Sequence, residues 1–543
     1  MTQLSKQFFR RVGLPLLLAL AIVPSRAPGA DGLVTECTEE ALRAAITDAL
    51  EGDGVVEFAC DGTITLTNTV ALTNEDSDTP ISLTLDATGR GVTISSLTDT
   101  NATSAVRLFS VDTNIGLTLI NLTLANGRST NGGAIYNLGA NTNVNCTFSN
   151  NIAIGTNGQS GRSFSTNAGA LTGHKGGDAM PGQPASGGAI YNLGTLVLTE
   201  CAFLTNTVFG GNGGVGGTGE SGRALGGAGG RGGRGGSALG GAICNDATKT
   251  TRGELVLTNC SFNSNQAVGG TGGQGGAGAA GAFSGFNGNG AMGGAASGAA
   301  IYNKGLLTMV ASTLALNNAF GGHSSAAGNS GIRGKRGPGG GESLGGGVCN
   351  LGSSTNVNCT FFGNSVSGGD GGNGGNSRSQ GGRGGDGGGA WGGNVYSAHL
   401  FAATNCTFTD GGVLGGVGGG AGTGPFAGRN GVTGVSHGGN LANRSGPFYL
   451  KNCLLAFPVG GTIVSTNTTT TTNATGVTNA IVSGNGYGRF TDRGFNLSSD
   501  HSIRFGKNSG SFITNDVKVG VLAQNGGPVE TIELLTDSPA INA

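Results

Sequence analysis

The chain has 543 residues, with 29 Lys and Arg against 30 Asp and Glu, so its formal charge is −1. This balance argues against a general nucleic-acid binder, because such proteins usually carry a strongly basic surface. The 114 glycines and 12 prolines approach the share found in low-complexity chains, but the glycines are concentrated in particular segments.

Residues 1–30 have the layout of a secretory signal peptide. A basic start and an apolar stretch from Leu14 to Val23 precede small residues, and we expect cleavage near Ala27 or Ala30. An uncleaved N-terminal anchor is the alternative. Cleavage removes four basic residues and leaves 25 basic against 30 acidic ones, a charge of −5. We therefore expect a secreted or cell-surface protein with no transmembrane span after cleavage.

Residues 31–127 are expected to form an N-terminal cap and the first coils of a stacked repeat. The cap is an amphipathic helix over residues 37–50, with Thr38 as its N-cap. Its apolar face is expected to contain Leu42, Ala45, Ile46, Ala49 and Leu50. Cys37 and Cys60 flank this helix and are the candidate disulfide, because exported chains permit disulfides. Two buried thiols are the alternative.

A repeat occupies residues 128–460, and a repeat of this kind decides the architecture of a chain. The element GGAIYN at Gly132 recurs, with weaker copies last, at Gly187, Gly240, Gly298, Gly345, Gly392 and Gly438. After each copy come an apolar alternation that indicates half-buried strands and an Asn-Cys-x-Phe element. Such a unit cannot bury its apolar side alone, so it must stack on its neighbours. The sequence predicts an all-β fold, a single-stranded right-handed parallel β-helix of about ten or eleven coils.

Two columns of side chains are expected to stack along this β-helix. The first is an internal cysteine and serine ladder of Cys146, Cys201, Cys260, Ser312, Cys359, Cys406 and Cys453. Free cysteine packs as a small hydrophobe, and a thiolate metal site is the alternative. The second is a turn at which asparagine side chains hydrogen-bond along the stack: Asn137, Asn192, Asn245, Asn303 and Asn350.

Glycine-rich insertions leave most coils after the second element and return at the next Gly-Gly pair, so they should all emerge from one corner. Between the coils eleven basic residues stand against five acidic ones, which gives the insertions +6 and the rest of the mature chain −11. A basic array on an acidic body predicts attraction of anionic polysaccharide. Insertions on one face of a repeat often form its binding face, but their low apolar content favours a flexible, solvated fringe.

We predict no catalytic centre, no metal site and no cofactor. Glycoside hydrolysis usually needs two carboxylates that flank the bond, and the acidic residues of the repeat region are scattered. His174, Lys175 and Asp178 are the one local mixture of acid and base, in an insertion where a solvated loop is expected.

The paired GGA[I/V] and FxxN elements resemble the repeats of chlamydial polymorphic outer-membrane proteins over roughly residues 130–455. That resemblance implies a surface-exposed, adhesin-like β-helix, at the outer membrane of a bacterium if it is not secreted. Residues 461–543 are expected to form a linker and a closing segment. This segment resembles the choice-of-anchor Q-type domain of exported β-helix proteins in its NGGP at Asn525 and SPAIN at Ser538.

The expected function is that of an exported structural and binding protein of the cell surface or extracellular matrix. Its expected partners are anionic polysaccharide or other cell-surface components, and not nucleic acid. The alternative is a carbohydrate-active enzyme, either a polysaccharide lyase or a glycoside hydrolase, because many such enzymes are β-helices and a fold alone does not settle function.

Overall fold

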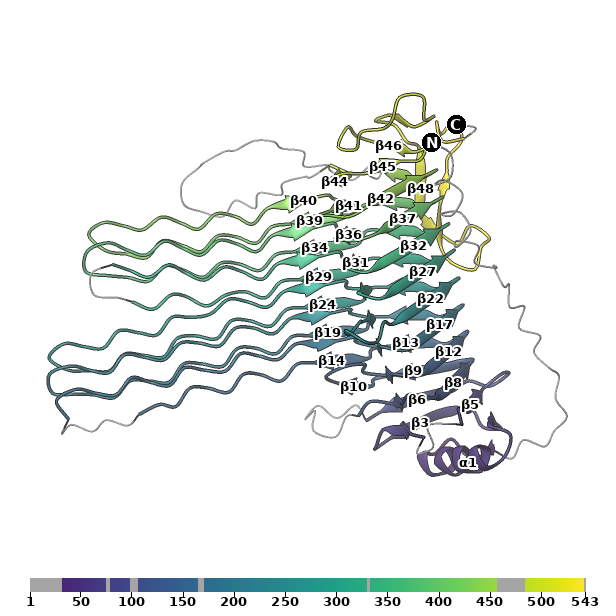
Figure 1. Cartoon of the computed structure of the whole chain (residues 1–543), viewed down its shortest axis with the longest axis horizontal. Helices are drawn as coiled ribbons and strands as arrows, with labels where there is room; N and C mark the ends of the chain where they lie inside the picture. Colours follow the sequence, from purple (N-terminus) through teal and green to yellow (C-terminus); the bar gives the residue numbers. More distant parts are fainter. Residues whose placement is uncertain are drawn as a thin grey trace, which may run out of the picture.

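The computed structural model describes residues 32–74, 79–97, 106–164, 170–329, 333–456 and 484–541. In this part of the chain nearly all strands are parallel and stack into long sheets that form a parallel β-helix (Figure 1). The expected signal peptide and the Thr-rich linker fall outside these residues. Among the described helices none is long and apolar enough to cross a bilayer.

Three sheets enclose the core of the β-helix. Sheet A contains β1 (Gly32–Val34), β2 (Val55–Phe58), β5 (Ile81–Asp86), β8 (Ile115–Ile120), β12 (Ala140–Val144), β17 (Thr195–Thr199), β22 (Glu254–Thr258), β27 (Leu306–Val310), β32 (Ser353–Val357), β37 (Phe401–Thr404), β42 (Phe448–Lys451) and β45 (Thr491–Asp492). Sheet B contains β3 (Gly62–Leu66), β6 (Val92–Ser96), β9 (Leu122–Ala125), β13 (Thr147–Ser149), β18 (Ala202–Leu204), β23 (Ser261–Asn263), β28 (Thr313–Ala315), β33 (Thr360–Phe362), β38 (Thr407–Thr409), β43 (Leu454–Ala456), β46 (Leu497–Ser498) and β47 (Phe512–Ile513). Sheet C contains β4 (Val70–Leu72), β7 (Phe109–Val111), β11 (Ile135–Asn137), β16 (Ile190–Asn192), β21 (Ile243–Asn245), β26 (Ile301–Asn303), β31 (Val348–Asn350), β36 (Val395–Ser397), β41 (Leu441–Asn443) and β44 (Gly486–Tyr487).

Two shorter sheets mark the corner from which the insertions leave and return. Sheet D contains β10 (Arg128–Ser129), β14 (Ile152–Ile154), β19 (Thr207–Phe209), β24 (Gln266–Val268), β29 (Asn318–Phe320), β34 (Ser365–Ser367) and β39 (Gly412–Leu414). Sheet E contains β15 (Ala185–Ser186), β20 (Ala238–Leu239), β25 (Ala296–Ser297), β30 (Ser343–Leu344), β35 (Ala390–Trp391) and β40 (Ser436–His437). A small apolar cluster of Ala and Val side chains fills the space between these two sheets.

Equivalent residues of successive coils pair in register, so like side chains stack on like. Phe148, Phe203 and Phe262 are cross-strand neighbours, and their buried rings stack with centroids 4.7 and 4.6 Å apart. The spacing is that of neighbouring strands in a sheet. This register confirms that one repeat forms one coil.

The two expected columns lie inside the stack. The ladder cysteines are buried free thiols. Ser312, which replaces cysteine in one coil of the ladder, accepts a hydrogen bond from the backbone N of Cys260 at 3.1 Å. At the asparagine turn the side-chain amides form a chain of hydrogen bonds from Asn137 to Asn350. In each bond Nδ2 donates to the next Oδ1 at 2.7–2.8 Å. Within the described residues Asn137 Oδ1 has no donor, because Val111 occupies its place in the coil below.

A second asparagine column was not predicted as a column. In it each Nδ2 donates to the next Oδ1 at 2.6–3.0 Å, through Asn151, Asn206, Asn265, Asn317, Asn364, Asn394, Asn440 and Asn485. Four of the first five are the asparagines of the FxxN elements, and Asn317 closes the fourth copy, in which Leu314 replaces Phe. The coils that follow have no asparagine at that position. Their Gly-Gly elements instead have the sequence Gly-Gly-Asn, which ends at Asn394 and at Asn440. The column therefore continues through Asn394 and Asn440.

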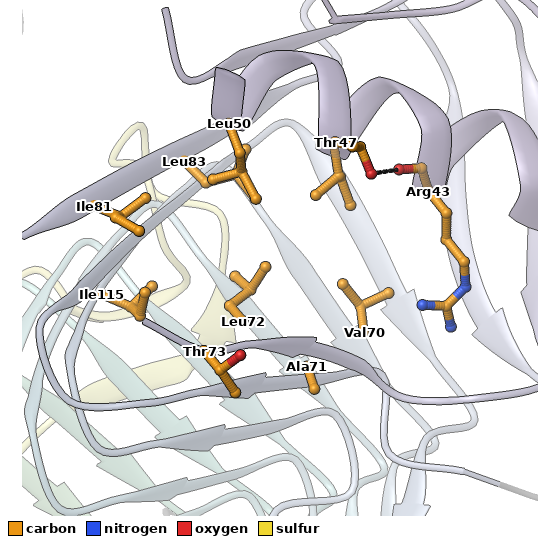
Figure 2. A pocket seen from close by; sticks show the side chains of 11 residues that line it. Arg43, Thr47, Leu50, Val70, Ala71, Leu72, Thr73, Ile81, Leu83 and Ile115 are labelled. Atoms are coloured by element: carbon orange, nitrogen blue, oxygen red, sulfur yellow. Dashed lines mark hydrogen bonds between the residues drawn. The ribbon is translucent and has the colours of Figure 1, made fainter. Parts of the chain in front are cut away.

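The N-terminal cap is the helix α1 (Glu39–Glu51), whose Thr38 side chain accepts from the backbone N of Ala41. Cys37 and Cys60 form the predicted disulfide. The placement of Leu50 on the buried face was wrong, because Leu50 is 43% exposed. It lies at the edge of a cavity of about 390 Å³ between α1 and the first coils (Figure 2).

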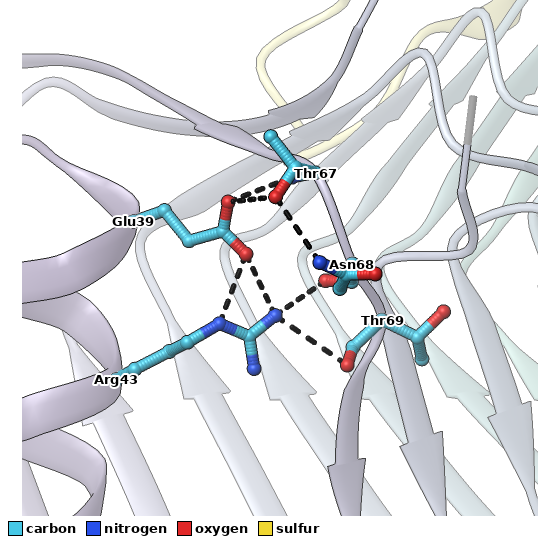
Figure 3. A network of polar contacts seen from close by, with 5 residues as sticks. All are labelled: Glu39, Arg43, Thr67, Asn68 and Thr69. Carbon is cyan, nitrogen blue, oxygen red and sulfur yellow. Dashed lines mark hydrogen bonds and ion pairs between the residues drawn. The ribbon is translucent and has the colours of Figure 1, made fainter. Parts of the chain in front are cut away.

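A polar network fixes the N-terminal half of α1 to the first coil (Figure 3). Glu39 accepts hydrogen bonds from Thr67 N and from Arg43, both at 2.7 Å. Arg43 in turn donates to Asn68 O. The network ties the cap to the strand end that follows β3, so the first coil is covered and not left as an open edge.

The chain closes with an antiparallel hairpin of β48 (Val519–Ala523) and β49 (Thr531–Leu534). It lies along the outside of the stack (Figure 1), where Thr313 donates to Glu530 O. Val517 and Val519 pack against Leu454 and Leu497 of sheet B.

The insertions are ordered where the structure describes them, which contradicts the flexible-fringe interpretation. Each has an outgoing and a returning leg, and together the legs form the slab at the left of Figure 1. The outgoing legs are residues 155–164, 210–222, 269–281, 321–329, 368–377 and 415–423, and the returning legs are 170–184, 223–237, 282–295, 333–342, 378–389 and 424–435.

Glycines spaced by three residues bond one leg to the next. The N–H groups of Gly155, Gly158 and Gly161 donate to the carbonyls of Phe209, Asn212 and Val215 at 2.7–2.8 Å. Returning legs bond to outgoing legs in the same way, as from Gly230 N to Gly217 O at 2.8 Å. A three-residue period without internal hydrogen bonds is that of polyproline II. These bonds satisfy the backbone without an apolar core, which the flexible-fringe interpretation did not consider.

Glycine is required at the contact positions because the legs pack backbone to backbone. A Cβ on Gly217 would lie 2.0 Å from Arg162 O, and a Cβ on Gly230 would lie 1.8 Å from Gly177 O. In the second outgoing leg two positions of each triplet are packed glycines, and the third position, occupied by Asn212, Val215 and Thr218, is exposed. On the outgoing face polar side chains at this position bond to the next leg, as when Asn212 N donates to Asn157 Oδ1 at 2.8 Å.

Gly217→Ala should destabilise the slab by about 1–3 kcal/mol or more, because the added methyl must push two legs apart. We expect a lower melting temperature and faster trypsin cleavage at Arg231 and Arg234. Thr218→Ala, at the exposed neighbouring position, is the control and should change neither. Unchanged melting and trypsin resistance in Gly217→Ala would contradict the close packing of the legs.

Candidate functional site

The charges of the slab are segregated between its two kinds of leg. The returning legs contain ten basic and three acidic residues, a net charge of +7, whereas the outgoing legs contain Arg162 against Glu220 and Asp370, a net charge of −1. The outward side of the returning legs is called the returning-leg face below. It gathers nearly all of the positive charge that the sequence assigns to the insertions.

Three arginines form a row across neighbouring returning legs. Gly337 N donates to Arg383 O and Gly384 N donates to Arg429 O, both at 2.8 Å, so Arg336, Arg383 and Arg429 stand at one level. Legs that continue in-register coils are about 4.8 Å apart. The row therefore repeats a cation at the strand spacing of the β-helix.

Asp386 holds two of these arginines in place. Its carboxylate lies 2.6 Å from Arg336 Nη2 and 2.7 Å from Arg383 Nη2. The hydrogen bond from the backbone N–H of Val432 is the main cause that lowers the pKa of Asp386. The positive charges of Arg383 and Arg336 lower it further. The carboxylate therefore stays ionised, and the row of three guanidinium groups around it keeps a charge of +2.

A second cationic group comes from three insertions. Lys175 pairs with Asp178 at 2.8 Å, and Asp178 Oδ1 also accepts from Arg231 N at 2.7 Å. Burial, together with the nearby Arg231 and Lys175, lowers the pKa of Lys335. Like charges held this close disfavour one another, so an anion that enters would relieve their repulsion.

A shallow hollow lies across the third, fourth and fifth returning legs. Its volume is about 620 Å³, and Met292, Arg336, Glu342 and Asp386 line it with backbone from several glycines. Its wall combines guanidinium, carboxylate and backbone peptide groups, which suits a hydroxylated, charged ligand better than an apolar one.

An aromatic corner lies where the outer side of sheet C meets sheet E, at the base of the returning legs. Five of the six tyrosines and the single tryptophan of the chain lie here with one histidine: Tyr136, Tyr191, Tyr302, Tyr396, Tyr487, Trp391 and His437. Large and small residues alternate on sheet C, where Cys244, Cys349 and Ala442 separate the tyrosines. Leu239 and Leu344 of sheet E lie in the coils of the two cysteines. The middle of the corner is therefore packed shut.

The residues singled out in the sequence take several places. The cysteine ladder and the asparagine turn are buried in the stack and have a structural role. Lys175 and Asp178 form an exposed ion pair, and His174 Nε2 is 3.8 Å from Glu220. In the described residues there is no group of three His, Cys, Asp or Glu side chains placed to hold a metal ion.

Sequence reasoning missed the aromatic corner and the segregation of charge between the legs. The Tyr of each GGAIYN copy was a signal for the corner, since it recurs at one position of the coil. The segregation was visible as basic residues in the second half of five of the six insertions. Assigning it required the position at which each insertion turns back, which only the folded legs define.

Burial raises the pKa of the Asp410 carboxyl to about 6. A raised carboxyl pKa can mark a general acid. Thr409 Oγ1 donates a hydrogen bond to Asp410 Oδ2 at 3.5 Å. This contact supplies no carboxylate partner for acid–base catalysis, so Asp410 carries no functional assignment.

No family model and no curated protein matches the chain. One solved structure that does match describes the nine polyproline type II helical bundle antifreeze protein of the springtail Granisotoma rainieri, with crystal waters that match the ice lattice. The identity is 17%, and the match covers 51% of this chain and 93% of that chain at a TM-score of 0.09. A score of this size does not establish a shared fold.

Asp410→Asn should stabilise the protein as the pH rises. Because the folded pKa of about 6 exceeds the ordinary value, the favourable contribution of protonated Asp410 is complete below about pH 4 and is lost as the pH rises through 6. Melting curves should separate the variant from the parent by about 1 kcal/mol more above pH 6 than at pH 4, a value reduced for partial exposure.

Asn also tolerates the positive φ of residue 410, which adds a gain independent of pH. The exposed Asp516→Asn is the control and should give a constant difference. A difference for Asp410→Asn that does not grow with pH would contradict the burial argument.

Proposed function

We propose that this chain is an exported structural and binding protein of the cell surface or extracellular matrix, and that its returning-leg face binds linear anionic polysaccharide. The observation that carries the proposal is the separation of +7 on the returning legs from −1 on the outgoing legs. A charge pattern of this kind steers an anionic polymer to one face of the slab. The acidic body, at −11 without the insertions, repels the same polymer.

Order in the legs supports binding by limiting its entropic cost. The cations stand on backbone that is already hydrogen-bonded at every third residue. Binding then restricts mainly the arginine and lysine side chains, not a whole disordered segment. Flexible glycine-rich segments of the same charge would lose far more conformational entropy.

The spacing of the cations suits a repeating ligand. In the arginine row a cation recurs about every 4.8 Å across three legs. Along a leg, Arg231 and Arg234 are three residues apart, or about 9 Å, since polyproline II rises about 3.1 Å per residue. A linear polyuronate carries one carboxylate on each sugar ring, so several carboxylates of one chain can face the arginine row together. Arginine can also bind each carboxylate through two parallel N–H groups.

The signal-like residues 1–30 and the disulfide between Cys37 and Cys60 support export, because disulfides persist in oxidising compartments. A secreted β-helix with one charged, projecting slab suits a role in cell-surface adhesion or matrix organisation. This assignment to the outer surface belongs to the proposal.

The triple variant Arg336→Gln, Arg383→Gln and Arg429→Gln tests the binding face. We expect about tenfold weaker binding to polygalacturonate, since three partly exposed cations contribute roughly 0.5 kcal/mol each. Binding of the parent protein should also weaken between about 50 and 300 mM NaCl, because salt screens exposed charges. Sedimentation with the polymer or calorimetry gives the dissociation constants.

Lys249→Gln, Arg504→Gln and Lys507→Gln is the matched control, since it removes the same charge from exposed positions outside the slab. This control should bind like the parent. Equal losses in the two triple variants would show that only net charge matters, and unchanged binding in the slab variant would refute the returning-leg face as the site.

A further inference from the structure

The late end of the aromatic corner differs from its middle. Trp391, His437 and Tyr487 come from three successive coils and form one aromatic cluster. The ring centroids of His437 and Tyr487 are 3.9 Å apart at an interplanar angle of 19°, and those of Trp391 and His437 are 4.6 Å apart. Arg444 lies over Trp391, with Cζ 5.4 Å from the ring centroid. These four residues are called the aromatic platform.

Exposure separates Tyr487 of the platform from the tyrosines in the middle of the corner. Tyr302 and Tyr396 are only 5% and 6% exposed, whereas Tyr487 is 41% exposed. Tyr487 pairs with Ala442 in sheet C, and this small neighbour leaves room for the Tyr487 ring beside His437. An aromatic ring with one face packed and one face open is a stacking surface for a ligand.

The polar edges of the platform have unused hydrogen-bonding capacity. Within the part of the chain that the structure describes, Trp391 Nε1, the His437 ring and Tyr487 Oη make no hydrogen bond, and Arg444 makes no ion pair. Burial lowers the pKa of His437, so its ring is mainly neutral at pH 7 and offers both a donor and an acceptor. These partly exposed groups lie beside a ring face, where they can hydrogen-bond to the hydroxyls of a ligand.

The platform lies at the foot of the basic returning legs. His437 belongs to β40, which directly follows the last returning leg, and Trp391 belongs to β35, which directly follows the fifth. Arg429 of the arginine row is eight residues before His437, or about 25 Å in an extended polyproline II leg. An extended oligosaccharide can therefore reach from the row to the platform.

We propose that the aromatic platform is a sugar-stacking subsite that takes one pyranose ring of an acidic polysaccharide on the open face of Tyr487, with Arg444 as the partner of its carboxylate. This inference deepens the proposed function and rests on it for the class of polymer. Sugar C–H groups pack on the ring face, while the hydroxyls bond to the indole N–H, the imidazole and the phenol. The ring contributes stacking, which salt does not screen, and Arg444 selects a uronic acid over a neutral sugar.

The single tryptophan of the chain gives a direct measurement. Titration of the full chain with trigalacturonate should change its tryptophan emission, because Trp391 is the one emitter and lies in the platform. Tyr487→Ala should weaken this response about tenfold. Arg444→Gln should reduce the preference for trigalacturonate over neutral cellotriose but retain the response to both.

Tyr449→Ala is the matched control. Tyr449 is another partly exposed tyrosine with an arginine over its ring, Arg493 at 4.3 Å, and it lies in sheet A away from the corner. Its loss should leave the titration unchanged, and melting curves should show that both tyrosine variants fold. An emission that does not respond to either sugar in the parent protein would overturn the subsite, as would an equal response in parent and Tyr487→Ala.

The two proposals fail separately. The arginine-row triple variant should lose polymer binding and keep the emission response to the short oligosaccharide. If the parent binds polygalacturonate but its emission does not respond to trigalacturonate, the subsite is wrong and the returning-leg face stands. If the emission responds but the row variant still binds the polymer, the returning-leg face is wrong and the subsite stands.

Discussion

Hydrogen bonding between successive coils, in register, is the constraint on which the whole molecule depends. In the body it pairs strand with strand and stacks Phe on Phe and Asn on Asn. In the slab it joins leg to leg through a glycine at every third residue. The same coil-to-coil repeat thus forms two different structures. The body packs around side chains, and the slab packs backbone to backbone.

The body could be read from the sequence because its residues recur at one position of each coil. The cysteine ladder, the Asn137 column, the capping helix and the disulfide all lie where the pattern placed them. Leu50 was misplaced because helical periodicity does not show where the neighbouring coil ends. The second asparagine column was harder, since Asn394 and Asn440 replace the FxxN asparagine from a different element.

The slab could not be predicted from apolar content, which is the usual sign of order. Low apolar content indicates disorder only when backbone groups have no partner other than water. Here the missing Cβ atoms let neighbouring backbones come close enough to bond, and the coils hold the ends of every leg in register. The informative signal was the three-residue spacing of glycine, together with insertions at equivalent points of successive coils. The charge segregation and the aromatic corner follow from that geometry and could not be assigned before it.

The proposed function follows from what this architecture presents to solvent. A disordered fringe of the same composition would carry the same charge, but it could not hold cations in rows or place them beside a stacking surface. The proposed binding by the returning legs therefore depends on the order of the slab as well as on the segregation of charge.

The most direct test of the account is amide hydrogen exchange across the second insertion, residues 210–237, measured in the unmodified protein by mass spectrometry. The account predicts slow exchange at the glycines that bond to neighbouring legs, with protection close to that of the β-helix strands. Exchange at the rate of an unfolded chain throughout this segment, beside protected strands in the body, would contradict it.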